Sequence, residues 1–480
     1  MSNLFFELIR VSLGTQECLS RTPSKGDWGK MFMLARKQSL VGICFSGVQK
    51  ICAGFFDESE AMKRWNCPQQ GYLLWMELAA KILKKNEEMN KHTEEVQEFF
   101  RSKGCPTLIL KGQGIAKLYG DLALLRNCGD IDIWMSGGRK KAIALSMEQF
   151  GKVEGLTVHH IHFPLLKDIP VELHFKPSFL SSPLRNRRFM EFCRLYGPKD
   201  CSSDVPSLAF NRVFILLHCY RHLCGHGVGM RQLIDYFFVL KSEAVNKSTS
   251  QQDNKSTSLR DNKSTSQQDN ESTSQQDNES TSLRDNKTTS QQVETNLEPR
   301  RQPQLNQGEA LIEPAKPLNQ GVSLIEPAKP IEPAKPLNQG VSLIEPRRQP
   351  QLNQGEALIE PAKPSSIWWI EQLGMLRFCR AVMWIMKEVF GLEEKYLLCE
   401  PDEAGGKFLL NEVMHAGNMG HDEDRFDSHI NRNALLRYWY NLKRDIRLIK
   451  LCPHEALWDP IYNVYQFVWC KVKACGIRKP

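Results

Sequence analysis

The sequence TLILKGQGIAKLYGDLALLRNCGDIDIW, residues 107–134, decides the fold. Its first four residues are β-branched or apolar and predict a short strand, and the glycines that follow predict a turn whose backbone can approach a ligand closely. Apolar residues then recur at helical spacing from Ile115 to Leu125, and a second strand follows at Asp130–Trp134. The stretch therefore predicts a strand, a turn, a helix and a second strand.

The second strand carries two aspartates on one face. Asp130 and Asp132 are two residues apart and point to the same side, while Ile131 and Ile133 point to the other. Neighbouring carboxylates repel each other unless a cation lies between them, and a hard divalent cation such as Mg²⁺ suits them best. Two aspartates at this spacing also occur by chance at a solvated strand end, so the pattern alone leaves both interpretations open.

A third acidic residue follows in another predicted strand. The segment Pro170–Phe175 alternates, so Glu172 and His174 share one face. A strand predicted at Leu156–Pro164 would form a hairpin with it. If the later strand lies beside the aspartate strand, Glu172 provides a third carboxylate.

Residues 243–365 differ in composition from the rest of the chain. They contain no Phe, Trp, Tyr, Cys or His, and the 20-residue sequence EPRRQPQLNQGEALIEPAKP occurs twice, at 298–317 and 345–364. Such a low-complexity repeat cannot bury enough apolar surface to offset chain entropy, which predicts a disordered insert. The insert holds 14 basic and 17 acidic residues, so without its net −3 the chain's +8 becomes +11. A basic remainder suits phosphorylated ligands and is equally typical of an ordinary soluble protein.

The sequence predicts a soluble, cytoplasmic protein without membrane insertion. The 15 cysteines have no regular spacing, the N-terminus MSNLFFELIR does not resemble a signal peptide, and no uncharged apolar run approaches the roughly 18 residues of a spanning helix. Helical spacing dominates on both sides of the predicted strands. We expect an α+β fold, with a small mixed sheet flanked by N- and C-terminal helices. The predicted division is 1–104 helical, 105–200 α/β core, 201–242 helical, 243–365 disordered insert and 366–480 helical.

Two further patterns have ordinary explanations as well as functional ones. His218, His222 and His226 recur every fourth residue, which suits zinc, but the glutamate of an H-E-x-x-H motif is absent and structural histidines are the stronger interpretation. Basic and aromatic residues alternate irregularly over 431–473, a pattern that binds nucleic acid in some proteins. More often it marks a helix whose long cationic side chains lie over an apolar stripe.

The order of these motifs resembles a known family. L-K-G at 110–112 is followed by R-x-x-G-D-I-D-I-W, then V-E-L-H-F, H-x₃-H, G-x-R-Q-x-x-D and G-N-x-G. This order is similar to that of uncharacterised bacterial nucleotidyltransferase-like proteins related to the DNA polymerase β superfamily. The resemblance covers nearly all of the chain outside the insert.

The resemblance implies an enzyme that transfers a nucleoside monophosphate from a nucleoside triphosphate to an acceptor hydroxyl and releases pyrophosphate. The implied ligands of two Mg²⁺ ions, or of Mn²⁺, are Asp130, Asp132 and Glu172. The implied nucleotide-binding residues are Lys111, Gly112, Gly114, Arg126 and His174. Arg126 is also an implied partner of the three carboxylates. The acceptor, whether a small molecule, a protein or RNA, stays open.

Two alternatives also stay open. Many superfamily members have Gly-Ser in the phosphate-facing turn, whereas this chain has Lys111-Gly112-Gln113-Gly114, which leaves room for a catalytically weak nucleotide-binding or protein-interaction module. A D-x-D glycosyltransferase is the other alternative, although that fold generally places several βα units before the motif.

Overall fold

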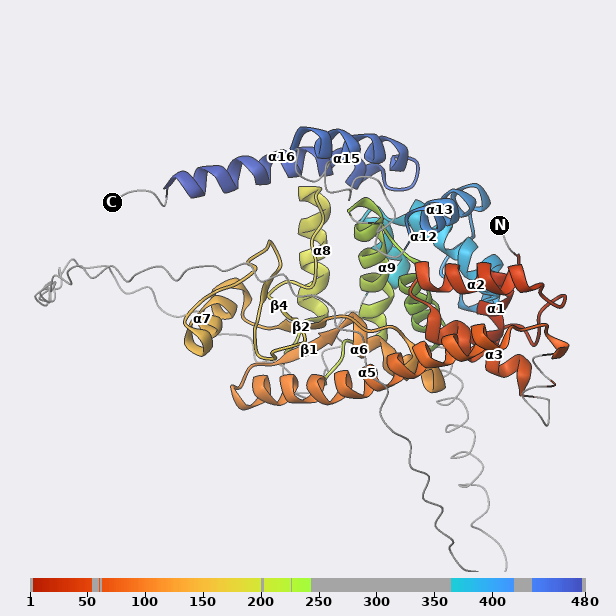
Figure 1. The fold of residues 1–480 in the computed structure, drawn as a ribbon. Coiled ribbons are helices and arrows are strands. Elements are labelled where there is room, and N and C mark those ends of the chain that lie inside the picture. The colour runs from red at the N-terminus through yellow and green to blue at the C-terminus, as the bar shows by residue number, and fades with distance from the viewer. Residues whose placement is uncertain are drawn as a thin grey trace, which may run out of the picture. The chain divides into compact units, whose positions relative to one another are not determined.

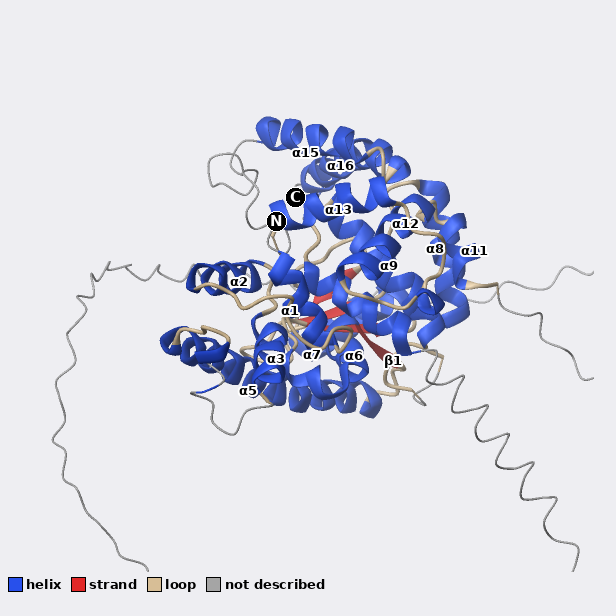
Figure 2. Cartoon of the chain, turned by 90° about the vertical axis from the view of Figure 1, so that its right-hand side faces the viewer, coloured by secondary structure: helices blue, strands red, loops and turns tan. Residues whose placement is uncertain are grey.

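The computed structural model describes residues 3–53, 60, 63–199, 203–225, 227–242, 364–417 and 434–476. All of them belong to one unit, formed by residues 1–265 and 361–480. Helices surround a single four-stranded mixed sheet in this unit (Figure 1, Figure 2). The predicted α+β fold is therefore confirmed. The predicted disordered insert lies outside the described residues apart from its last two positions, so it stays a prediction, as does the division into five regions.

The helices described before the first strand are α1 (Asn3–Leu13), α2 (Lys25–Lys37), α3 (Val41–Cys52) and α5 (Gln69–Ser102). In α5 the buried side chains, among them Trp75, Met89, Val96 and Phe100, follow the helical repeat, so one face of this 34-residue helix is buried along its length. Its C-terminal half packs against the sheet, as Figure 1 shows. The predicted helical N-terminal region is confirmed.

The sheet contains β1 (Thr107–Leu110), β2 (Ile131–Met135), β3 (His160–His162) and β4 (Val171–His174) in the order β1-β2-β4-β3. β1 pairs with β2 antiparallel, β2 with β4 parallel, and β4 with β3 antiparallel. The predicted hairpin is confirmed, with an earlier strand that is shorter than expected. The parallel pairing puts β4 directly beside the aspartate strand.

The two faces of the sheet have different chemistry. Ile131, Ile133, Val171 and Leu173 are buried in a cluster with the end of α5 and with α7 (Gly138–Phe150). On the other face Trp134 joins the larger helical core. Leu108 and Leu110 of β1 lie on that second face and join the same core, and polar side chains occupy its other positions on β2, β3 and β4. The alternation read from the sequence therefore separates an apolar face from one that is polar over β2, β3 and β4.

The segment between β1 and β2 differs from the single helix predicted at Ile115–Leu125. It consists of a short helix, α6 (Lys111–Ala116), and a 3₁₀ segment, η1 (Lys117–Leu125). Gly120 has a φ of 56° inside η1, a conformation that a regular helix does not contain. The predicted helix is therefore wrong in type, because this backbone angle interrupts it.

Helices complete the described chain after the sheet. They are α8 (Pro183–Tyr196), α9 (Leu208–Cys224), the helical residues 230–242, α11 (Ser366–Gln372), α12 (Leu376–Trp384), a π-helical turn at Ile385–Val389, the 3₁₀ turn η3 (Glu394–Tyr396), α13 (Glu403–Ala416), α15 (Ala434–Leu448) and α16 (Pro453–Gly476). α11 and α12 are separated near Gly374, where φ is 75°. Within the described ranges, none of these helices combines the length and apolarity that crossing a membrane requires.

Candidate functional site

The polar face of the sheet forms one wall of a cavity of about 370 Å³. Strand register explains why its side chains meet: Asp132 lies opposite Glu172, and His174 lies opposite His160. The facing wall comes from α9 and the residues after it. The cavity is lined by Lys111, Gly112, Arg126, Gly129, Asp130, Asp132, His159, His160, Glu172, His174, Pro177, Ser178, Phe179, His218, Arg221, His222, Gly225, Arg231, Gln232 and Asp235.

Asp132 is the centre of the charged contacts on this face. Its Oδ1 accepts hydrogen bonds from Lys111 Nζ at 2.8 Å and from His174 Nε2 at 2.9 Å, and its side chain is 3% exposed. Burial raises the pKa of the Asp132 carboxyl, but the charge of Lys111 and the hydrogen bond from His174 outweigh burial and lower the pKa below its usual value. Asp132 is therefore ionised at neutral pH despite its burial.

Glu172 lies next to Asp132 and is more open to solvent, with a side chain that is 21% exposed. Its Oε2 is 3.3 Å from His174 Nε2 and 3.5 Å from His160 Nδ1. Burial lowers the pKa of His174, and the hydrogen bonds to Asp132 and Glu172 raise it by more, so the net direction is upward. His174 thus lies between two carboxylates, and its hydrogen bonds to them stabilise the protonated imidazole.

Asp130 also lines the cavity, just before β2. The negative charge of Asp132 is the main cause that raises the pKa of the Asp130 carboxyl, followed by burial. This repulsion is what a bound cation would relieve. The ligand atoms of Asp132, Glu172 and His174 lie within 4.8 Å of one another, and the described groups at that spacing do not include Asp130. The predicted trio is therefore brought to one cavity, with Asp130 farther from the common point.

The Lys111-Gly112 turn connects β1 to the cavity through an unusual backbone. Gly112 has φ 32° and ψ −117°, and Lys111 itself has a φ of 45°, which is rare for a residue with a side chain. A Cβ added at Gly112 would lie 3.7 Å from the carbonyl oxygen of Asp130. This conformation brings the turn close to Asp130 and directs the Lys111 ammonium to Asp132.

Gly114 and Arg126 take positions that differ from the predicted ones. Gly114 does not line this cavity, and a Cβ there would come within 2.5 Å of the Ile109 carbonyl oxygen, so close packing explains this glycine. Arg126 lines the cavity, but its guanidinium forms two hydrogen bonds with Asp235, at 2.7 and 2.8 Å, rather than supporting the sheet carboxylates. Tyr119 donates a third hydrogen bond to Asp235 at 2.6 Å.

The sheet, the Lys-Gly turn and the Arg126–Asp235 pair all fall within the span of a known family. The family model described as "Uncharacterised nucleotidyltransferase" matches residues 24–261. The match covers 238 of the 480 residues, just under half of the chain, so it shows what this part of the chain is similar to. No curated protein and no solved structure matches the chain. The resemblance seen in the sequence motifs is confirmed over this span, and it supports transferase activity.

A divalent cation fits the carboxylate face of the sheet. Asp132 and Glu172 offer oxygen ligands to the same point, and Asp130 is held nearby in repulsion with Asp132. Oxygen ligands are those that Mg²⁺ prefers. The described groups with ligand spacing do not include His218 or His222, although both line the cavity. The third residue of the predicted zinc pattern, His226, and Asn418 of the G-N-x-G motif lie outside the described residues.

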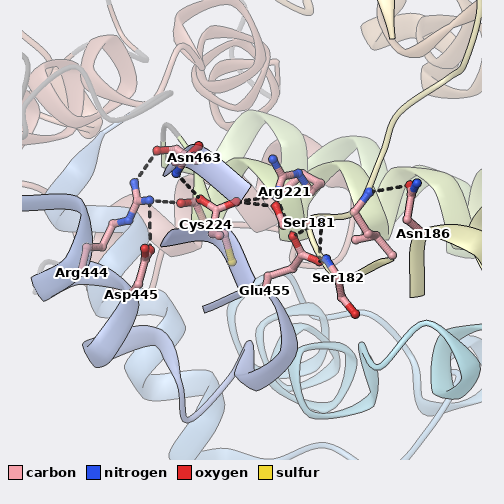
Figure 3. A network of polar contacts seen from close by, with 12 residues as sticks. Ser181, Ser182, Asn186, Arg221, Cys224, Arg444, Asp445, Glu455 and Asn463 are labelled. Carbon is pink, nitrogen blue, oxygen red and sulfur yellow. Dashed lines mark hydrogen bonds and ion pairs between the residues drawn. The ribbon is translucent and has the colours of Figure 1, made fainter. Parts of the chain in front are cut away.

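The C-terminal helix α16 supports one wall of the cavity from behind. Arg221, on α9, forms ion pairs with Glu455 at 2.7 Å and Asp459 at 3.2 Å, both on α16. Glu455 also accepts hydrogen bonds from the backbone N–H of Ser181, as Figure 3 shows. Arg221 lies over the ring of Phe179, 4.4 Å from its centroid. These contacts fix Arg221 and Phe179 in the cavity wall.

Sequence reasoning missed several residues of this wall. His159 and His160 belong to the run His-His-Ile-His before β4, a local pattern that could have marked a polar strand. Burial lowers the pKa of His160 to about 4. Arg221 and Phe179 had no recognisable local pattern, because their roles depend on helices more than 200 residues later in the chain.

Proposed function

We propose that this protein transfers a nucleoside monophosphate from a nucleoside triphosphate to an acceptor hydroxyl, with Mg²⁺ and with release of pyrophosphate. The observation that carries the proposal is the parallel register of β2 and β4, which sets Asp132 and Glu172 side by side in the cavity beside the Lys111-Gly112 turn. The match of residues 24–261 to a nucleotidyltransferase family model supports the same reaction class.

The carboxylates have distinct parts in this proposal. Asp132 is buried and ionised, so it is the fixed ligand, and Asp130, just before the same strand, adds a second carboxylate. Glu172 completes the set and, being partly exposed, is the group that can accept the proton of an attacking hydroxyl. Bound Mg²⁺ supplies the positive charge that stabilises the attacking and leaving oxygens of such a displacement.

Two cationic side chains suit the triphosphate. Lys111 lines the cavity on a turn whose Gly112 lets phosphate come close to the backbone. Arg231 lines the opposite wall, and no described carboxylate lies within ion-pair distance of it. Its Nη1 donates to the Asn127 carbonyl at 2.9 Å, and its buried Nε has no hydrogen-bond partner among the described groups. A buried donor without a partner is costly, and a phosphate oxygen would satisfy it.

Neither alternative function gains support from these residues. The described chain before β1 is helical, which does not suit the βα units expected of a D-x-D glycosyltransferase. A nucleotide-binding module without catalysis would need the same cavity. Binding must therefore be separated from turnover by experiment.

The test measures binding and turnover on the same purified full-length chain. Nucleoside triphosphates are titrated by calorimetry with and without Mg²⁺, and pyrophosphate release is followed in the presence of cell extract as a source of acceptor. We expect Mg²⁺-dependent binding and pyrophosphate release, both reduced on the order of 10²–10³-fold by Asp132→Asn. Asp121→Asn, an exposed acid outside the cavity, is the matched control.

The outcomes separate the two functions. Intact Mg²⁺-dependent nucleotide binding in Asp132→Asn would contradict the proposed role of the carboxylates. Nucleotide binding by the wild type without pyrophosphate release from any triphosphate would support the binding module instead.

A further inference from the structure

The edge of the sheet beside the carboxylates carries histidines that the proposed reaction does not use. β3 is an edge strand, and its two terminal residues, His160 and His162, point to the same face because they are two apart. In the antiparallel register with β4, His162 lies directly opposite Glu172. The hairpin therefore presents two imidazoles and one carboxylate on a single face.

The distances suit one metal ion. One ligand atom from each of His160, His162 and Glu172 lies within 4.8 Å of the others, and His160 Nδ1 is 3.5 Å from Glu172 Oε2. A tetrahedral ion with bonds of about 2.0–2.1 Å requires ligand atoms roughly 3.3 Å apart. His160 Nδ1 and Glu172 Oε2 already have about this separation. The side chain of His162 is exposed, and its ring lies against Gly155 and is stacked on the ring of His160.

The two imidazoles of this site prefer a different metal ion from the one that the carboxylates around Asp132 prefer. Imidazole nitrogens select borderline transition metals such as Zn²⁺, whereas carboxylate oxygens alone suit Mg²⁺. We propose that His160, His162 and Glu172 form a binding site for a transition-metal ion of the Zn²⁺ class at the edge of the sheet. The fourth position of the ion is left to water.

Sharing Glu172 gives the site a consequence, which rests on the proposed nucleotidyl transfer. A carboxylate oxygen engaged with an ion on the β3 side is withdrawn from the carboxylates around Asp132. Occupation of the edge site therefore lowers Mg²⁺-dependent turnover. Zn²⁺ at the edge site therefore inhibits turnover without occupying the residues that bind the nucleotide.

The metal site can be tested without any assay of turnover. Co²⁺, which reports its coordination through visible absorption, is titrated into the metal-free full-length chain carrying no histidine tag. We expect one Co²⁺ per chain in a four-coordinate spectrum, weakened by at least about 100-fold in His162→Ala, since loss of even an outer partner of a metal ligand costs about 10–100-fold. His415→Ala removes an exposed histidine on α13 and should bind Co²⁺ like the wild type.

The outcomes are decisive whether or not the chain is an enzyme. Absence of Co²⁺ binding by the wild type, or unchanged binding in both His162→Ala and His160→Ala, overturns the site. Loss of Co²⁺ in Asp132→Asn with retention in His162→Ala also overturns it, because the ion would then belong to the acidic pair. Circular dichroism confirms that each variant is folded. If Co²⁺ binds as expected while the wild type neither binds nucleotide nor releases pyrophosphate, the metal site stands and the proposed function fails.

Discussion

Asp132 and Asp235 are both almost fully buried, and both line the same cavity, yet their surroundings differ. Asp235 accepts two hydrogen bonds from Arg126 and one from Tyr119, so both its oxygens are engaged by a planar cation that matches them. Asp132 directs a single oxygen, Oδ1, to Lys111 and His174, and other acids surround it. The Asp235 carboxylate is fully paired with Arg126. The Asp132 carboxylate lies among other acidic side chains, including Asp130.

The cationic partners of the two aspartates differ in how they can respond when the negative charge of the aspartate is removed or shared with a ligand. Arg126 is 6% exposed and cannot lose its proton, so it depends on Asp235. Lys111 is 19% exposed and His174 can become neutral, so both can adjust when a ligand reaches Asp132. We infer that the first pair maintains the fold and the second group is suited to exchange partners.

The largest expected effect comes from Asp235→Asn. The change leaves the guanidinium of Arg126 buried without a countercharge, which costs about 3–5 kcal/mol in the free energy of unfolding. Urea denaturation followed by circular dichroism measures this loss. Asp168→Asn, at an exposed turn, serves as the control and should change stability by less than about 0.5 kcal/mol. A similarly small loss in Asp235→Asn would remove the distinction between the two acids.

Asp132→Asn should cost less stability than Asp235→Asn, although it is the variant expected to reduce the proposed nucleotide binding and turnover. His174 can release its proton and Lys111 can reach water, so we expect a loss of about 1–3 kcal/mol in the free energy of unfolding. The same urea titration compares the two variants directly. If Asp132→Asn destabilises the chain as much as Asp235→Asn does, the carboxylates of the sheet are structural in the same sense.

Features that depend on local sequence were predicted well. The strands at β1, β2 and β4 follow from alternation and β-branched residues, and alternation alone puts Glu172 and His174 on one face. The sequence did not predict that β2 and β4 lie side by side; the third carboxylate was predicted only if they do. A parallel pairing requires contact between residues about 40 apart, for which no local pattern exists.

Features that depend on tertiary contacts were missed. Arg126 was expected near the sheet carboxylates, but its partner Asp235 is 109 residues later in the chain. The helix predicted after the Lys-Gly turn became a 3₁₀ segment, because the angle at Gly120 outweighs the apolar spacing. The cavity wall at Arg221 depends on α16, on the far side of the insert. The sequence thus predicts which side chains share a face of one strand or helix. The cavity depends on how these elements pack together, which local sequence does not predict.

Arg231→Gln tests whether the unsatisfied cation of the cavity binds phosphate. A charge-assisted hydrogen bond contributes about 1.5–3 kcal/mol, so we expect nucleotide affinity to fall roughly tenfold or more. Calorimetric titration with Mg²⁺ and the preferred triphosphate gives the change. Arg187→Gln, an exposed arginine on α8, should bind nucleotide normally. Equal affinities in the two variants would exclude Arg231 from the triphosphate contacts.

The smallest effect concerns Asp445, a buried acid that is only partly paired. Its Oδ1 is 3.3 Å from Arg444 Nη2, and its buried Oδ2 has no partner among the described groups. Burial is the main cause that raises the pKa of Asp445 from 3.8 to about 7, and the charge of Arg444 opposes it. The folded state therefore binds this proton more tightly than the unfolded state does, and stability falls as pH rises from about 4 to about 7.

Asp445→Asn removes this dependence, because an amide stays neutral and mimics the protonated acid. The variant should match the wild type near pH 4 and melt at a higher temperature near pH 8, with most of the difference developing between pH 4 and pH 7. Thermal melts across this range measure the difference. A constant offset at every pH would show that Asp445 is ionised throughout this range and that Arg444 closes the pair.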